Sequence, residues 1–353
     1  MSSILSLARA ELLRLEPHPV GGEDPALVRL HANESPWPPP GDGTRAGIHR
    51  YPDPQPPELV LGLAALYGTP PERVLVCRGG DEAIDLLVRG FCRAGADAVF
   101  VLPPTFGQYR TAARIQGAEV ETLELDRARG FQPDERELFA RLGPSVKLLF
   151  LCSPNNPTGN VLAPALVERA CRELAGRSLV VLDEAYVEFS GVPSLVPWTE
   201  RFPNLVVLRT LSKAHALAGA RIGTLVGAPE LVGLLRRVLQ PFALSAPGVE
   251  AALEALAPAR LAATRERVRG LCGERERLRG ELARSPLVRR VFPSAANFLL
   301  VECVDSARFL AASAHGGVLA RGFPAGHELH DCVRVTVGAQ AENDRLLEAV
   351  SRP

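Results

Sequence analysis

Lysine is almost absent from this chain. Only Lys147 and Lys213 stand among the 40 basic residues, so arginine carries nearly every positive charge. A guanidinium stays protonated and is a poor nucleophile, whereas a lysine amine can lose its proton and condense with a carbonyl. Lys213 comes soon after the apolar run 205–208, at the end of a predicted strand where α/β enzymes place their chemistry. It is therefore the first candidate catalytic residue. Composition alone is equally compatible with two lysines kept by chance, and Lys147, just before an apolar run, fits that explanation.

Other scarcities exclude whole classes of protein. The formal net charge is zero, so no basic surface for nucleic acid or an anionic membrane is indicated. Apolar runs are far shorter than the roughly 20 residues that a membrane-spanning helix needs. The seven cysteines are odd in number and widely spaced, without a C-x-x-C pair or a preceding secretory leader. We therefore expect a cytoplasmic protein with buried free thiols, no metal site and a small-molecule partner.

The length and the order of the apolar runs predict an α/β protein of two domains. A chain of 353 residues exceeds what a single core usually supports. Short β-branched runs alternate with helical patterns, which predicts a parallel sheet covered on both faces by helices. The predicted strands are Val74–Cys77, Ala98–Leu102, Val120–Leu125, Leu148–Cys152, Leu179–Leu182 and Leu205–Leu208, with two later ones at Asn297–Glu302 and Val333–Val337.

The domain boundaries follow changes in sequence character. Residues 1–30 should form an N-terminal helix over Ile4 to Leu15 and then an arm. Residues 31–240 should form the large domain and residues 241–353 a smaller α/β domain. The smaller domain should open with the arginine-rich helix Pro258–Leu282.

Polar residues follow three successive strands of the predicted sheet. The first group is Ser153 to Gly159, which is also typical of an ordinary turn. The second is Asp183 with Tyr186, although an aspartate there can simply cap the next helix. The third runs from Ser212 to Arg221, and it suits an anion beside a reactive amine as well as an exposed loop. Because carboxyl ends of parallel strands meet at one sheet edge, their convergence favours a binding site there.

Several stretches of the chain, in this order and spacing, resemble one enzyme family. They are His31–Glu34, Arg50–Pro52, Arg78–Glu82, Pro103–Gly107, Ser153–Gly159, Asp183–Tyr186, Thr210–Arg221 and Val333–Gly338. Together they resemble the fold-type-I pyridoxal phosphate aminotransferases, and most closely the histidinol-phosphate aminotransferase family, over nearly the whole chain. The resemblance implies a large domain with a mostly parallel central sheet flanked by helices, plus a smaller α/β C-terminal domain.

The resemblance implies a role for each residue around the cofactor ring. Lys213 would hold pyridoxal phosphate as a Schiff base and move a proton between the substrate α-carbon and the cofactor. Asp183 would keep the pyridine nitrogen protonated, and Asn156 and Tyr186 would donate hydrogen bonds to the phenolic oxygen. Phe106 would stack on the ring, where the family often has a tyrosine.

The cofactor phosphate would have its own binding residues. Gly80 and Asp81 would present backbone N–H groups at the start of a helix, after the permissive Gly79. Ser212 and Arg221 would add a hydroxyl and a bidentate cation. The family also places a tyrosine of the neighbouring subunit on this phosphate. Tyr51 matches it, so the resemblance implies a homodimer; the same tyrosine is also compatible with an ordinary half-buried aromatic.

Substrate contacts form a further implied layer. Arg334 corresponds to the family's clamp for the amino-acid carboxylate, and Arg321 to the arginine that meets the substrate phosphate, although a surface arginine remains an alternative for Arg321. Asn33 would approach the substrate carboxylate. His18 stands where the family often has a tyrosine, which puts an imidazole contact from that loop in question.

The resemblance therefore implies ping-pong transfer of an amino group from L-glutamate to imidazole acetol phosphate, giving 2-oxoglutarate and L-histidinol phosphate in histidine biosynthesis. An aromatic aminotransferase and a threonine-phosphate decarboxylase share the same frame and remain alternatives. A non-catalytic regulator that binds the cofactor is disfavoured, since only some thirty residues precede the match and no basic patch is present.

Overall fold

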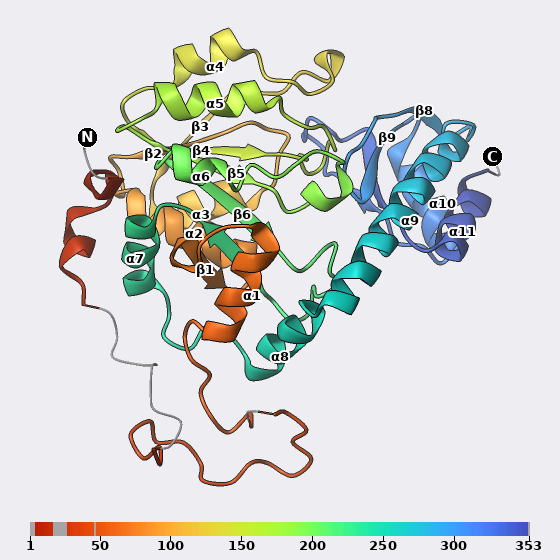
Figure 1. Ribbon diagram of the computed structural model, residues 1–353. Coiled ribbons are helices and arrows are strands. Elements are labelled where there is room, and N and C mark those ends of the chain that lie inside the picture. The colour runs from red at the N-terminus through yellow and green to blue at the C-terminus, as the bar shows by residue number, and fades with distance from the viewer. Residues whose placement is uncertain (1–3, 17–26, 46, 352–353) are drawn as a thin grey trace.

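A seven-stranded sheet forms the centre of the larger part of the molecule, in a computed structural model that describes residues 4–16, 27–45 and 47–351 (Figure 1). Its strands are β1 (Val74–Cys77), β2 (Ala98–Val101), β3 (Glu119–Thr122), β4 (Val146–Cys152), β5 (Leu179–Asp183), β6 (Leu205–Thr210) and β7 (Gly223–Val226). Their order is β1-β7-β6-β5-β4-β2-β3, and only β7 runs antiparallel to its neighbours. The sheet is thus mostly parallel, as the sequence predicts.

Side chains of the central strands alternate between two helical layers. In β4, Leu149 and Leu151 pack on one face, while Leu148 and Phe150 pack on the other. Because both faces are covered, the strands read as continuous apolar runs rather than alternating ones. The first face packs against α1 (Pro57–Tyr67), α5 (Pro164–Glu173) and α8 (Ala246–Ala255), and the second against α2 (Gly80–Phe91), α3 (Gln108–Gln116) and α7 (Pro229–Val238). The short helices α4 (Glu135–Arg141) and α6 (Trp198–Arg201) complete this part, together with the 3₁₀ turns η3 (Pro71–Arg73), η4 (Arg127–Arg129) and η5 (Val187–Phe189).

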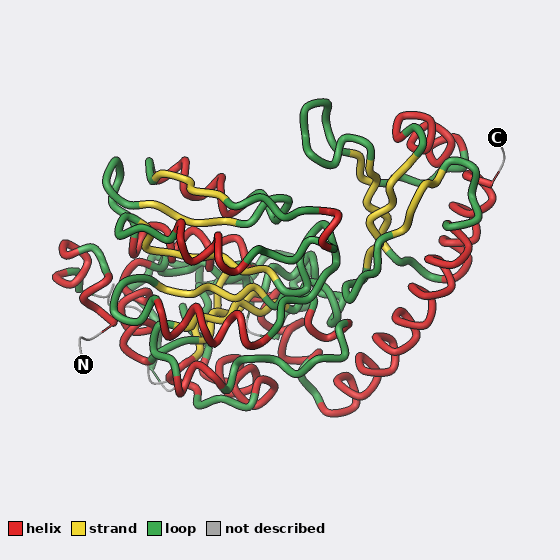
Figure 2. The backbone as a smooth tube through the Cα atoms, turned by 90° about the horizontal axis from the view of Figure 1, so that it is seen from above, coloured by secondary structure: helices red, strands yellow, loops and turns green. Residues whose placement is uncertain are grey.

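A second, antiparallel sheet has its own core. The long helix α9 (Pro258–Leu282) leads from α8 toward this sheet, as Figure 2 shows from above. The sheet has the order β10-β11-β9-β8, and its buried side chains pack against α9 and the two C-terminal helices. The elements are β8 (Val288–Val291), β9 (Phe298–Cys303), α10 (Ser306–His315), β10 (Arg321–Gly322), β11 (Cys332–Thr336) and α11 (Gln340–Ser351).

The N-terminal helix predicted over Ile4 to Leu15 is wrong. The segment forms two 3₁₀ turns, η1 (Ile4–Leu7) and η2 (Ala10–Arg14). Between them the Arg9 backbone N–H donates to the Gly90 carbonyl of α2 at 3.0 Å, and this contact takes the donor that a continuous helix would need.

The other predicted elements are found with small shifts at their ends. Val74–Cys77 and Pro258–Leu282 have the predicted bounds, whereas the strand predicted at Val120–Leu125 is the shorter β3. The sequence missed β7, β8 and β10. Of these, β8 has the two central arginines Arg289 and Arg290, both exposed, and β10 spans only two residues, so neither carries an apolar pattern.

Three further expectations concern the whole chain. All seven cysteines are free, and all except Cys272 are buried. Within the described residues, no helix has the length and apolarity that crossing a membrane requires. The domain boundaries at residues 30 and 240 stay predictions, and Val249 and Ala252 of α8 pack in the core of the larger part.

Candidate active site

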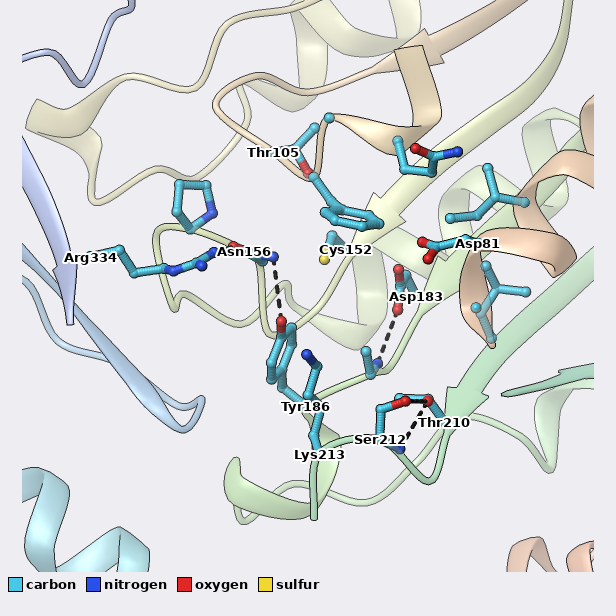
Figure 3. Close-up of a pocket in the computed structure, with 18 of the residues that line it drawn as sticks. Asp81, Thr105, Cys152, Asn156, Asp183, Tyr186, Thr210, Ser212, Lys213 and Arg334 are labelled. Carbon is cyan, nitrogen blue, oxygen red and sulfur yellow. Dashed lines mark hydrogen bonds between the residues drawn. The ribbon is translucent and has the colours of Figure 1, made fainter. Parts of the chain in front are cut away.

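A cavity of about 740 Å³ opens where the two sheets meet. Its wall is made by the carboxyl ends of β4, β5 and β6, the first turns of α2 and α3, and the strands β10 and β11 (Figure 3). The predicted site residues that line it are Gly80, Asp81, Phe106, Asn156, Asp183, Tyr186, Ser212, Lys213, Arg221, Arg321 and Arg334. Residues far apart in the sequence therefore meet at the sheet edge where parallel strands end.

Lys213 lies three residues after β6, and its side chain is open to the cavity. Its Nζ is 5.8 Å from the centre of the Tyr186 ring. The protein atoms around the amine desolvate it, and together with the positive charges of Arg334 and Arg221 they lower the pKa of Lys213. A lowered pKa increases the fraction of neutral amine, which is the form that attacks a carbonyl.

Asp183 ends β5 and is almost fully buried, with 8% of its surface exposed. Burial raises the pKa of this carboxyl group, while hydrogen bonds from the Tyr109 hydroxyl and the Ala185 N–H oppose the rise. The Asp183 carboxylate lies across the cavity from Asn156 and Arg334 (Figure 3). This geometry suits a cationic ring nitrogen, because an ion pair in a buried site is strong when the acid keeps its hydrogen bonds.

One end of the cavity is built from close backbone contacts. Gly79 has φ +80°, and a Cβ added to it would lie 2.5 Å from the Arg221 guanidinium. A Cβ on Gly223 would lie 2.3 Å from the Gly79 carbonyl carbon. Only glycine allows this packing, which presents the first N–H groups of α2 beside Arg221.

The polar groups at this end fit a phosphate. The Thr210 hydroxyl lies 3.0 Å from the Ser212 hydroxyl and 3.2 Å from the Ile222 carbonyl, and these contacts fix the Ser212 hydroxyl at the cavity wall. Arg221 lies 3.2 Å from Asp81, a contact between two half-exposed side chains, so its guanidinium keeps further donors. A helix start, a hydroxyl and a guanidinium are the groups that bind phosphate in proteins, so the residues fit the phosphate of pyridoxal phosphate.

Asn156 connects the two sheets across the cavity. Its amide donates to the Tyr186 hydroxyl at 3.3 Å, and its carbonyl oxygen accepts from Arg334 Nη1 at 2.5 Å (Figure 3). Burial lowers the pKa of Arg334, whose guanidinium also lies 5.5 Å from the Phe298 ring centre. Arg334 of the second sheet is thus held over the ends of β4 and β5.

Two arginines face each other at the cavity mouth. Arg321 of β10 is the direct cross-strand partner of Arg334 of β11, and both line the cavity. In the described part of the chain, no carboxylate forms an ion pair with either of them. Like charges directly opposite are unfavourable, and an anion between them would relieve the repulsion.

Tyr51 and Asn33 do not line the cavity of this single chain. Tyr51 is 47% exposed and stacks on Phe242, with ring centres 4.2 Å apart. Asn33 is exposed and has φ +55°. The Glu34 carboxylate fixes the backbone at Tyr51: it accepts from the Tyr51 N–H and from Arg50, each at 2.8 Å. The position of His18 lies outside the described residues.

The sequence missed several residues at the site. Thr105, Arg110, Cys152, Thr210 and His327 also line the cavity, and Tyr109 lies beneath it. Tyr109 stands three residues after Phe106 at the start of a helix. That spacing places two aromatic side chains on neighbouring positions and could have signalled the pair. Arg110 and His327 carry no such signal, since neither stands in a motif.

Comparison with known proteins agrees with this geometry. Residues 28–350 match the family "Aminotransferase class I and II". The histidinol-phosphate aminotransferase of Xanthomonas euvesicatoria pv. vesicatoria is 47% identical over 99% of this chain and 98% of its own. The chain belongs to the histidinol-phosphate aminotransferases of class I and II.

Two solved structures have folds similar to that of this chain. The histidinol-phosphate aminotransferase of Sinorhizobium meliloti, in complex with pyridoxal-5'-phosphate, is 28% identical, with a TM-score of 0.77 over 86% of this chain and 82% of that one. L-threonine-O-3-phosphate decarboxylase of Porphyromonas gingivalis has a TM-score of 0.73 at 23% identity, over 86% and 90% of the two chains. The second likeness shows the fold alone.

Proposed function

We propose that this chain transfers an amino group from L-glutamate to imidazole acetol phosphate, with pyridoxal phosphate as cofactor, and so makes L-histidinol phosphate for histidine biosynthesis. One observation carries the proposal: a lysine with a lowered pKa, a buried carboxylate and two facing arginines share one cavity. The first two suit the cofactor, and the arginines suit substrates that are themselves anions.

Around the cofactor, the residues of this chain divide the work. Lys213 Nζ would hold the cofactor through its aldehyde carbon, and once the substrate amine had taken its place, the free Lys213 amine would move the α-proton of the amino acid to the cofactor side. When bound, pyridoxal phosphate supplies an electron sink for the pair left on the α-carbon. Asp183 holds the ring nitrogen protonated, Asn156 and Tyr186 bind the phenolic oxygen, and Phe106 covers the ring face.

At the anionic ends, other residues orient the ligands. Gly80, Asp81, Ser212 and Arg221 hold the cofactor phosphate through backbone N–H groups, a hydroxyl and a guanidinium. Toward the substrate, Arg334 binds the α-carboxylate and Arg321 the phosphate of the keto substrate. Asn33, which lies outside the cavity of the single chain, stays a proposed contact of the carboxylate.

A second copy of the chain completes the site in this proposal. Tyr51 is 47% exposed although it stacks on Phe242, and its backbone is fixed by Glu34, so part of its side chain is open to a partner. We expect it to reach the cofactor phosphate of the partner subunit in a cytoplasmic homodimer. Sedimentation of the holoenzyme at micromolar concentration should show a dimer, and a monomer with full activity would contradict this.

Half-reaction kinetics test the reaction itself. Mixing purified holoenzyme with glutamate alone should convert the cofactor to its pyridoxamine form, seen as an absorbance change, and release 2-oxoglutarate. Imidazole acetol phosphate should then restore the original spectrum, and phenylpyruvate should do so less well. Release of carbon dioxide from an amino-acid phosphate without the glutamate reaction would instead favour a decarboxylase.

The two lysines offer a matched pair of variants. Lys213→Arg should abolish the absorbance of covalently bound cofactor, because a guanidinium does not condense with an aldehyde. Lys147→Arg should leave that absorbance unchanged, since Lys147 lies in β4 and does not line the cavity. A Lys213→Arg protein that retained the absorbance would overturn the assignment.

A further inference from the structure

Tyr109 lies directly beneath the cavity without lining it. It stands in the first turn of α3, is fully buried, and donates its hydroxyl proton to Asp183 Oδ2 at 2.6 Å. The other carboxylate oxygen of Asp183 accepts from the Ala185 N–H at 3.0 Å. One side-chain hydroxyl and one backbone N–H are therefore the donors that the described residues give to this buried acid.

Tyr186 follows Asp183 in the chain and interacts with its charge, and the other charged and titratable groups around Asp183 come from four elements. Asp81 of α2 disfavours its ionised form, and Lys213 after β6 favours it. Burial raises the pKa of the Cys152 thiol at the end of β4, so that group stays neutral beside the carboxylate. Tyr109 of α3 heads the groups that lower the Asp183 pKa against the effect of burial. Loss of its hydroxyl would remove the largest interaction that opposes desolvation.

Aromatic contacts fix the ring that carries this hydroxyl. The Tyr109 ring stacks on Phe150 of β4, with centres 4.6 Å apart and planes 11° apart. It also meets Phe106 edge to face, at 5.7 Å and 84°. Phe106 itself lines the cavity. The Tyr109 side chain therefore supports Phe106 with its ring and holds the Asp183 carboxylate with its hydroxyl. Such a fixed donor needs no rearrangement when charge develops in the site.

We propose that Tyr109 is a positioning residue for the transamination: its hydroxyl keeps the Asp183 carboxylate ionised and aimed at the cofactor ring nitrogen. The role rests on the proposed function, because it matters only where a protonated ring nitrogen faces Asp183. Tyr109 touches neither cofactor nor substrate and acts through Asp183 alone.

Tyr109→Phe tests this role, with Tyr67→Phe as its control. Phenylalanine keeps the ring contacts with Phe150 and Phe106 and removes only the hydroxyl. Tyr67 is also buried, but its hydroxyl makes one contact of 3.5 Å with Thr224 and lies away from the cavity. Both variants should fold, and their apoproteins should melt within a few degrees of the parent.

Kinetics and cofactor binding give independent readouts. Tyr109→Phe should slow the glutamate half-reaction by about 10- to 100-fold with little change in the glutamate KM, because a hydrogen bond to a charged group is lost. The pH below which the half-reaction rate falls should be higher than in the parent, because an Asp183 carboxyl with a higher pKa becomes protonated at a higher pH. The apoprotein should also bind pyridoxal phosphate more weakly, by fluorescence titration, and more so at pH 6 than at pH 8. Tyr67→Phe should show none of these changes.

Asp183→Asn separates the proposal from a general packing effect. Adding Tyr109→Phe to Asp183→Asn should cause no further loss of cofactor affinity, because the hydroxyl acts through the missing charge. Additive losses, or a Tyr109→Phe protein with the pH profile and affinity of Tyr67→Phe, would overturn the proposal. If the parent protein failed to react with glutamate, the proposed function would fail, while the affinity measurements would still decide the role of Tyr109.

Discussion

Replacing Asp331 by asparagine should weaken one of the contacts between the second sheet and the larger part of the molecule. Arg127, in η4 between β3 and α4, forms a bidentate ion pair with the Asp331 carboxylate, with N···O distances of 2.8 and 3.0 Å. The same guanidinium donates to the Glu328 carbonyl at 2.8 Å and lies 3.4 Å from Glu302. The Arg127 side chain is 29% exposed and that of Asp331 25%, so water screens the pair only in part.

The pKa of Asp331 gives the size of the expected effect. Hydrogen bonds from Arg127 hold this pKa at about 2, below its ordinary 3.8. A difference of this size corresponds to about 2 kcal/mol of preference for the ionised form in the folded state. Because the folded pKa is the lower one, the stabilisation is complete above pH 3.8 and disappears as the pH falls through 2. Asparagine retains one hydrogen bond to Arg127, so we expect a loss of about 1–2 kcal/mol at pH 7.

Thermal unfolding at pH 7 measures this loss. In a chain of this length, about 1–2 kcal/mol should lower the unfolding midpoint by about 1–3 °C. Asp134→Asn is the control, because Asp134 pairs with Arg129 of the same turn but both side chains are well exposed. Asparagine also caps α4 as aspartate does, so this variant should melt with the parent. Equal midpoints for Asp331→Asn and the parent, or an equal drop in the control, would refute the reasoning.

Two further variants probe the groups around the site. Arg209→Met should lower the free energy of unfolding in urea at pH 7 by about 3–5 kcal/mol, because it leaves the buried Glu184 and the half-buried Glu188 without their cation. A loss below about 1 kcal/mol, the size expected for an exposed ion pair, would contradict it. Gly223→Ala should weaken pyridoxal phosphate binding at least about tenfold, because the new Cβ collides with the backbone that precedes α2. In Gly227→Ala the new Cβ meets only side chains at 3.5 Å or more, so this variant should bind pyridoxal phosphate as the parent does. Equal affinities in the two variants would contradict the predicted effect of the collision at Gly223.

The strands of the central sheet were predictable because burial on both faces leaves an apolar signature. The run Leu148–Cys152 is visible for this reason, and β4 extends it only by Val146 and Lys147 at its start. Strands without that signature were missed, such as β8 with its exposed arginines and the two-residue β10. In the N-terminal segment the amphipathic pattern was real, but a contact with Gly90 decided the local structure, and such a tertiary contact leaves no mark on periodicity.

Site residues that directly follow strands were predictable, whereas their contacts across the fold were not. Asp183 and Lys213 follow strands, so the topology brings them to one edge of the sheet. The pairing of Arg321 with Arg334 depends on the register of two antiparallel strands, which the sequence of either strand does not reveal. The Tyr109 contact with Asp183 joins residues 74 positions apart, so it too depends on tertiary structure that the local sequence does not reveal.

The structure also separates working arginines from structural ones in a chain that has 38 of them. Arg209 is the more deeply buried, yet its charge is met by Glu188 at 2.6 Å, by Glu184 at 3.5 Å and by the Tyr67 ring at 4.7 Å. Arg334 has an amide oxygen and an aromatic ring as its partners among the described residues, and it faces another arginine. A half-buried charge without a counter-charge is costly, and an anionic ligand in the cavity would supply the missing charge. Compensation of charge, rather than burial or residue type, therefore distinguishes Arg334 from Arg209, and it supports the proposal that Arg334 binds an anionic substrate.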